Sequence, residues 1–171
     1  MSNRELNLEN LIREYLSDEG ILKEKLEGSD FEFGFIISFP PGTKNQNMSI
    51  YKLKNKNCVY ITIRTQISEK YTKPLSSLKG NKTFQFFNDI RKYFLIKEVY
   101  FRIDPQNFTF EIHEQMYPDR DEYISKDTLF KGIQKVFYCY AFSHILLEEL
   151  CSGKDISSSK FGPEFDLSLY S

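Results

Sequence analysis

Residues 31–39 have the sequence FEFGFIISF, in which Phe or Ile occupies every odd-numbered position. Glu32, Gly34, Ile36 and Ser38 fill the even positions, and the sequence Pro-Pro-Gly follows at residues 40–42. Apolar residues with a period of two are typical of a strand that buries one face. We therefore predict a strand over residues 31–39, in a sheet that packs one face against a core.

Four further segments repeat this alternation and extend the predicted sheet. In one of them, residues 59–67, Val59 and the isoleucines share one face, while Tyr60, Thr62, Arg64 and Gln66 share the other. Turn residues separate the segments within each of two pairs, at residues 55–57 and 105–107. The four predicted strands are residues 49–53, 59–67, 99–103 and 108–112.

Three segments have apolar residues at helical spacing. The first, residues 8–19, ends at Gly20, and the second, residues 84–96, follows Thr83 as a predicted N-cap. The third is long, residues 126–151, with Ser125 as its N-cap and an apolar face that includes Ile145. Pro74 and Gly80 lead us to read residues 69–81 as a loop.

These elements predict a single α+β domain over residues 1–151. The predicted order is α-β-β-β-α-β-β-α, with a five-stranded antiparallel sheet and the helices packed mainly on one face. Residues 152–171 are serine-rich and without periodicity, so we predict a C-terminal tail that is mobile or docks on the body.

Composition excludes several classes of protein. The 171 residues are 40% hydrophobic and 27% charged, which is typical of a globular domain rather than a disordered or collagen-like chain. The formal net charge is -1, so there is no overall basic footprint for nucleic acid. Three cysteines form no CxxC pair, and no signal peptide or membrane span is evident. We therefore expect a cytoplasmic protein that does not act in a membrane.

The predicted element order, over residues 8–151, resembles that of the class I type III secretion chaperones. More narrowly, residues 19–22, 31–40 and 125–151 look like a prokaryotic, largely archaeal domain family of unknown function with the same fold. The resemblance implies a small homodimer that holds an extended segment of a partner protein against hydrophobic patches. No signature motif transfers a binding residue, and this chain is less acidic than such chaperones.

Residues with possible chemistry are few. His113 with Glu111, and His144 with Glu148, have the residue types of a metal site, but a solvated sheet face and an ordinary core or interface histidine explain them better. Cys139 is read as a buried, inert thiol. Neither a phosphate-binding loop nor an HExxH motif is present. We therefore predict no catalytic residues, no metal and no cofactor, and that the protein is not an enzyme.

The second predicted helix supplies candidates for a partner or dimer contact. Phe86, Tyr93 and Phe94 widen its apolar stripe beyond the side on which Phe87 and Ile90 face the core. The competing interpretation is that all five side chains fill one core. The predicted function is a protein-binding module, of chaperone-like type, that captures a partner segment as a homodimer.

The alternative is a protein that binds single-stranded nucleic acid. Residues 43–70 contain six basic residues and one acidic residue, and Lys52, Lys54, Tyr60 and Arg64 are the candidate contacts. Against this, residues 104–122 contain six acidic residues and one basic residue, a strip that would repel phosphate.

Overall fold

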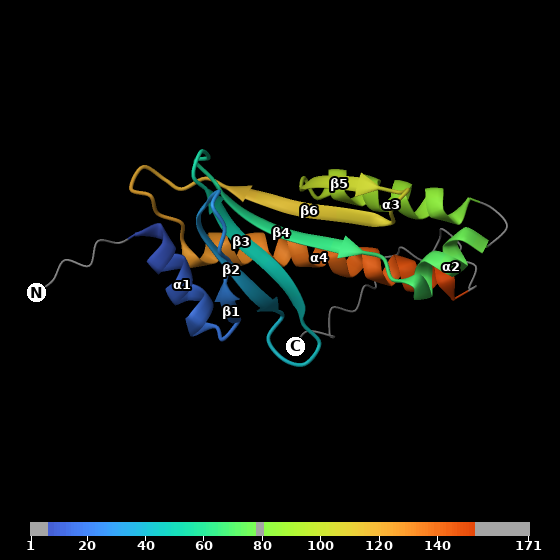
Figure 1. Ribbon diagram of the computed structural model, residues 1–171, viewed down its shortest axis with the longest axis horizontal. Coiled ribbons are helices and arrows are strands. Elements are labelled where there is room, and N and C mark those ends of the chain that lie inside the picture. The colour runs from blue at the N-terminus through green and yellow to red at the C-terminus, as the bar shows by residue number, and fades with distance from the viewer. Residues whose placement is uncertain (1–6, 78–80, 153–171) are drawn as a thin grey trace, which may run out of the picture.

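The computed structural model describes residues 7–77 and 81–152, which form six strands and four helices (Figure 1). The predicted tail, residues 152–171, lies outside these residues except for Ser152, which caps the last helix. The elements in chain order are α1 (Leu8–Asp18), β1 (Leu22–Lys25), β2 (Phe31–Phe39), β3 (Gln46–Leu53), β4 (Val59–Gln66), α2 (Glu69–Ser77), α3 (Lys82–Ile96), β5 (Tyr100–Asp104), β6 (Thr109–Met116) and α4 (Lys126–Cys151).

All six strands join one antiparallel sheet in the order β1-β2-β3-β4-β6-β5. The α+β class and the five predicted strands are confirmed, but the sheet has six strands rather than five. The missing strand is β1, whose sequence LKEK has no apolar alternation because three of its four side chains are exposed. An exposed edge strand leaves no period of two in the sequence.

The helices pack on the core face of the sheet. Helix α4 lies against β4 and β6, α3 against β5, and α1 against β1 and β2; Figure 1 shows α3 and α4 behind the strands. Phe33, Phe35 and Ile37 of the strand at residues 31–39 are buried on this face, as predicted. A register shift between Phe31 and Phe33 turns Phe31 to the opposite side of the sheet, where its ring contacts Tyr51. Ile145 was predicted on the apolar face of α4, but it is 40% exposed. We call the opposite side of the sheet the open face.

The predicted loop at residues 69–81 is wrong, because residues 69–77 form α2 despite Pro74. A proline removes one helical hydrogen bond, and tertiary contacts offset this loss: Leu75 is buried, and α2 lies against α3 and α4. The N-cap of α3 is Asn81, whose side chain accepts a hydrogen bond from the Phe84 N–H, rather than Thr83. The Thr83 hydroxyl instead donates to the Leu75 carbonyl at 3.2 Å.

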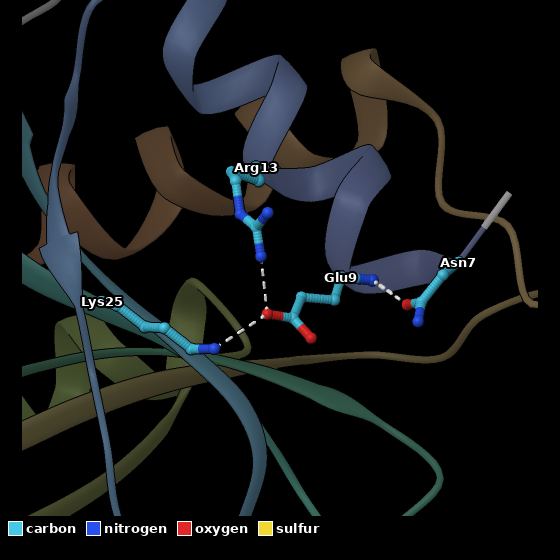
Figure 2. A network of polar contacts seen from close by, with 4 residues as sticks. All are labelled: Asn7, Glu9, Arg13 and Lys25. Carbon is cyan, nitrogen blue, oxygen red and sulfur yellow. Dashed lines mark hydrogen bonds and ion pairs between the residues drawn. The ribbon is translucent and has the colours of Figure 1, made fainter. Parts of the chain in front are cut away.

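Polar contacts tie α1 to edge strand β1 (Figure 2). The Asn7 side chain caps α1 by accepting from the Glu9 N–H at 2.8 Å. The Glu9 carboxylate lies 2.8 Å from the Arg13 guanidinium and 3.3 Å from the Lys25 ammonium. Exposed ion pairs of this kind contribute little stability. These contacts orient α1 on β1. Strand β1 itself is a short, charged edge of the sheet.

Helices α1 and α3 end in the same hydrogen-bonded motif. In α1, Gly20 donates to the Ser17 carbonyl and Ile21 to the Leu16 carbonyl; in α3, Glu98 donates to Leu95 and Val99 to Phe94. The second residue after each helix adopts a left-handed backbone conformation, with φ of 66° at Gly20 and 54° at Glu98. Glycine adopts this conformation without the clash that a Cβ atom introduces. The α3 terminus is therefore strained where the α1 terminus is not.

Replacing Glu98 with Gly is expected to raise the free energy of unfolding by about 1 kcal/mol, because it relieves the left-handed strain. Glu98→Ala keeps the strain and should not stabilise, whereas Gly20→Ala should lower stability by about 1 kcal/mol. Urea denaturation followed by circular dichroism measures all three. Equal stabilisation by Glu98→Ala would assign the effect to the lost carboxylate instead.

Gly132 lets α4 approach the sheet closely. A Cβ atom built on Gly132 would lie 2.8 Å from Ile61 Cδ1 and 3.1 Å from Met116 Sδ. Both contacts are with buried side chains, so Ile61 and Met116 would have to shift within a closely packed core to admit a Cβ atom. The small residue at this position therefore sets the spacing between α4 and strands β4 and β6.

Gly132→Val is expected to lower the free energy of unfolding by about 1–3 kcal/mol, since it overpacks this contact. Gln134 lies on the exposed side of the same helix, and Gln134→Val measures the separate cost of a β-branched residue in a helix, about 0.5 kcal/mol. Thermal and urea denaturation of both variants give the comparison. A cost at Gly132 no larger than that at Gln134 would contradict close packing here.

Candidate functional site

The open face of the sheet carries five rings in contact across five strands, which we call the ring ladder. Its members are Tyr100, His113, Tyr60, Tyr51 and Phe31, from β5, β6, β4, β3 and β2. Successive ring centroids lie 5.2, 5.9, 5.3 and 5.2 Å apart. The rings of Tyr100 and His113 are within 7° of parallel, and those of Tyr51 and Tyr60 within 15°. Strand pairing sets this arrangement, since Tyr100 is opposite His113 and Tyr51 is opposite Tyr60.

Beside the ring ladder lies a row of three charged residues. Arg64 and Arg102 are both paired in register with Glu111, which lies between them on β6. Both arginines are exposed, and within the described residues neither has a carboxylate oxygen within 4.0 Å. We call Arg64 and Arg102 the arginine pair.

The four residues predicted for nucleic-acid contact are not all brought together. Tyr60 and Arg64 share the open face, but the Lys52 ammonium is ion-paired with Glu32. The Lys54 ammonium donates to the Ser29 carbonyl at 2.7 Å. The nucleic-acid contacts predicted from the sequence did not include Arg102. Arg102 alternates with the apolar Phe101 and Ile103, and this pattern indicated that its side chain lies on the open face.

The acidic strip predicted over residues 104–122 is dispersed by the fold. Glu114 is on the core side, 3.0 Å from the Lys135 ammonium of α4. Asp104 closes the β5–β6 turn by accepting hydrogen bonds from Asn107 and Gln106, and these lower its pKa. The three acids of residues 119–122 follow the end of β6 and lie in the segment that leads to α4. Of these acids, Glu111 therefore lies between the two arginines, and Asp104 lies one step along β5 from Arg102 on the same face.

His113 is half-buried within the ring ladder. Burial lowers its pKa below the usual value, and Arg102 acts in the same direction, while Glu111 and Glu114 oppose the shift. Its neighbours on either side are rings rather than metal ligands. Among the described residues, no group of three or more His, Cys, Asp or Glu side chains could hold a metal ion.

Two of the three predicted contact residues on α3 are in the core. Phe86 and Phe94 are fully buried, with Phe94 against Phe101 and Phe110 of the sheet. Their prediction as surface contacts is therefore corrected: within this chain the interpretation that they fill the core holds. Tyr93 is half-buried and stacks on Phe142 of α4, with ring centroids 3.8 Å apart.

The exposed apolar residues of α3 lie elsewhere on the helix. Phe84 and Leu95 are each 62% exposed, and Ile96 is 76% exposed. A residue advances about 100° around a helix, so Leu95 lies on the flank opposite to Tyr93, facing away from α4. Phe84 is on the same side as Leu95. We call the surface formed by Phe84, Asn88, Arg91 and Leu95 the α3 flank. These residues are 4, 3 and 4 positions apart, a spacing that places them on one side of a helix.

The α3 flank adjoins a free sheet edge. Among the described residues, β5 pairs only with β6, and α3 lies against β5 (Figure 1). The opposite edge, β1, is occupied by Lys23, Glu24 and Lys25, charged residues that discourage strand addition. Strand β5, with the sequence YFRID, has aromatic and aliphatic side chains as well as charged ones. It is therefore less charged than β1 and is the better template for another strand.

A hollow of about 390 Å³ lies between the β2–β3 loop and α4. Its wall includes Lys44, Ile145, His144 and Glu148. His144 Nδ1 is 3.7 Å from the Glu148 carboxylate, which also accepts a hydrogen bond from the Tyr71 hydroxyl at 3.3 Å. This polar group and the surrounding apolar side chains form a recess of mixed character.

Cys139, predicted to be a buried and inert thiol, is fully buried in α4. Burial raises the pKa of its thiol to about 12. A thiol needs thiolate character and access to solvent to be reactive. The inert interpretation of Cys139 therefore holds. No helix among the described residues is long and apolar enough to cross a membrane.

Comparisons with known proteins give a family and a fold. A family model described as "Uncharacterized conserved protein (DUF2299)" matches residues 8–147. No curated protein matches. The crystal structure of an uncharacterized protein from Methanothermobacter thermautotrophicus is similar, with a TM-score of 0.74 and 20% sequence identity over 84% of this chain and 98% of that chain. At this identity the similarity concerns the fold alone.

The lowered pKa of His113 predicts how stability depends on pH. The unfolded chain, in which histidine has a pKa near 6.5, binds this proton more readily than the folded chain. The free energy of unfolding should therefore fall as pH drops through about 6.5 and level off below the folded pKa. His113→Gln should remove this component, and Gln115→Asn on the same strand should retain it. Urea denaturation across this pH range tests the difference, and identical profiles for wild type and His113→Gln would contradict it.

Proposed function

Since the chain belongs to the DUF2299 family of uncharacterized conserved proteins, we propose from its own surface that it is a protein-binding module that works as a homodimer. The observation that carries the proposal is the α3 flank, where Phe84 and Leu95 are each 62% exposed beside the free edge of β5. Large apolar side chains exposed on one side of a helix suit association with another protein surface.

The α3 flank is complementary to a second copy of itself. Its apolar residues lie at the two ends, and the polar residues Asn88 and Arg91 lie between them. When two such helices pack antiparallel about their centres, Leu95 of one copy meets Phe84 of the other, twice. A two-fold interface of this kind uses one surface patch on both subunits.

The resemblance to type III secretion chaperones supports a further part of the proposal, that the dimer holds an extended segment of a partner protein. The hollow between the β2–β3 loop and α4 has the composition for such a segment, with apolar Phe137, Ala141 and Ile145 beside charged Lys44 and Glu148. The proposed role is binding rather than catalysis. The cytoplasm is the proposed location, because it keeps Cys58, Cys139 and Cys151 as free thiols.

We expect the purified protein to have twice the chain mass of 20.3 kDa at micromolar concentration, by gel filtration with light scattering. Leu95→Asp places a charge in the proposed contact and should give a monomer with unchanged circular dichroism. Tyr138, on α4, is 44% exposed and lies outside the α3 flank, so Tyr138→Asp should leave the dimer intact.

The antiparallel arrangement has its own readout. In a Cys151→Ser background, the double variant Phe84→Cys with Leu95→Cys should form intermolecular disulfides on mild oxidation, and each single variant should form far less, since neither residue meets its own copy. A wild-type monomer, or a dimer that Leu95→Asp does not dissociate, would contradict the proposed interface.

A further inference from the structure

The ring ladder and the arginine pair form a second surface, which the proposed dimer contact on the α3 flank does not use. Successive residues on one face of a strand are separated by about 7 Å. Arg64 is therefore one such step from Thr62, and Arg102 one step from Tyr100. The arginine pair thus flanks the ring ladder along one side, across β4, β6 and β5.

The composition of this surface is aromatic, polar and charged. Four of its five rings are Tyr or His, and Ile36 is the aliphatic residue that the alternation of β2 adds to the open face. Interfaces between proteins are also enriched in Tyr and Arg, but their cores are apolar and depleted of charged residues. Here two guanidinium groups are exposed without an ion-pair partner among the described residues.

Tyr100 provides an accessible stacking surface. It is the end member of the ring ladder on edge strand β5, with His113 as its ring neighbour on the inner side, and it is 53% exposed. A planar base can extend the ladder by stacking on the outer side of this ring. Stacking on an aromatic side chain tolerates any base, because every base has a π-face.

The arginine pair supplies the second requirement, a site for phosphate. Guanidinium groups form paired hydrogen bonds with phosphate oxygens and keep their charge at all physiological pH values. Glu111 offsets one of the two charges, so the row keeps a net positive charge beside the rings. The fold also weakens the main objection from the sequence, because Glu114 is turned to the core side, whereas Asp104 keeps its charge in its own turn, one step along β5 from Arg102.

We propose that the open face binds single-stranded nucleic acid, with bases against the ring ladder at Tyr100 and backbone phosphates against Arg64 and Arg102. The proposal does not depend on the homodimer, since the α3 flank and the open face are separate surfaces. Paired bases in a duplex cannot stack on an external ring, so the site selects single strands.

Fluorescence anisotropy with labelled oligo(dT) and oligo(U) tests this site on the full chain, with a duplex of equal length for comparison. We expect both single strands to bind more tightly than the duplex, with affinity that falls as salt rises. Arg64→Gln and Arg102→Gln should each weaken binding and lower the slope of log affinity against log salt by about 0.7. Tyr100→Leu should weaken binding at least about fivefold without changing that slope.

Lys131→Gln is the matched control, because Lys131 is an exposed cation on α4, which packs on the opposite side of the sheet. It removes the same charge and should leave affinity unchanged. Circular dichroism of each variant checks folding, and ultraviolet crosslinking to oligo(U) followed by peptide mapping gives a readout on wild type, with Tyr100 as the expected site.

Three outcomes would overturn the proposal. The first is no anisotropy change with either oligonucleotide. The second is equal weakening by Lys131→Gln and Arg64→Gln, which would show attraction to overall charge. The third is capture of a protein through the open face, lost in Tyr100→Leu, by a chain that binds no oligonucleotide. None of these outcomes bears on the oligomeric state, so failure here leaves the dimer test independent.

Discussion

Helix α4 packs closely against β4 and β6, and this contact governs the arrangement of the whole sheet. Gly132 allows this approach, because a side chain there would overlap Ile61 and Met116. The contact decides which face of the sheet is buried. Since side chains alternate along a strand, burying Val59, Ile61 and Ile63 directs Tyr60, Thr62 and Arg64 outward. The open face and its ring ladder are therefore consequences of the core.

The two edges of the sheet have different physical characters. At one edge, β1 is short, charged and tied to α1 through Glu9 and Lys25. At the other, β5 is bordered by the exposed apolar part of α3. In a sheet with one protected and one unprotected edge, another strand can add at the unprotected edge only. This asymmetry is compatible with a closed dimer rather than an open chain of subunits.

Particular elements show how far sequence reasoning reaches. The bounds of β2 and α4 were predicted residue for residue, because each has a long and regular apolar period between clear turn or cap signals. Strand β1 and helix α2 were missed. The first buries too little of its surface to leave a pattern, and the second tolerates Pro74 because α3 and α4 support it. Both are held by contacts that are distant in the sequence.

Local periodicity was sufficient to predict the α+β class, the antiparallel strands and the long final helix, since it records which side of each element is buried. The packing between elements placed Phe86 and Phe94 in the core and left Phe84 and Leu95 outside. It also assembled the five rings from five strands, and it separated Lys52 and Lys54 from Tyr60 and Arg64. The physical reason is that periodicity assigns a face to each element, whereas strand register and helix contacts determine which faces meet.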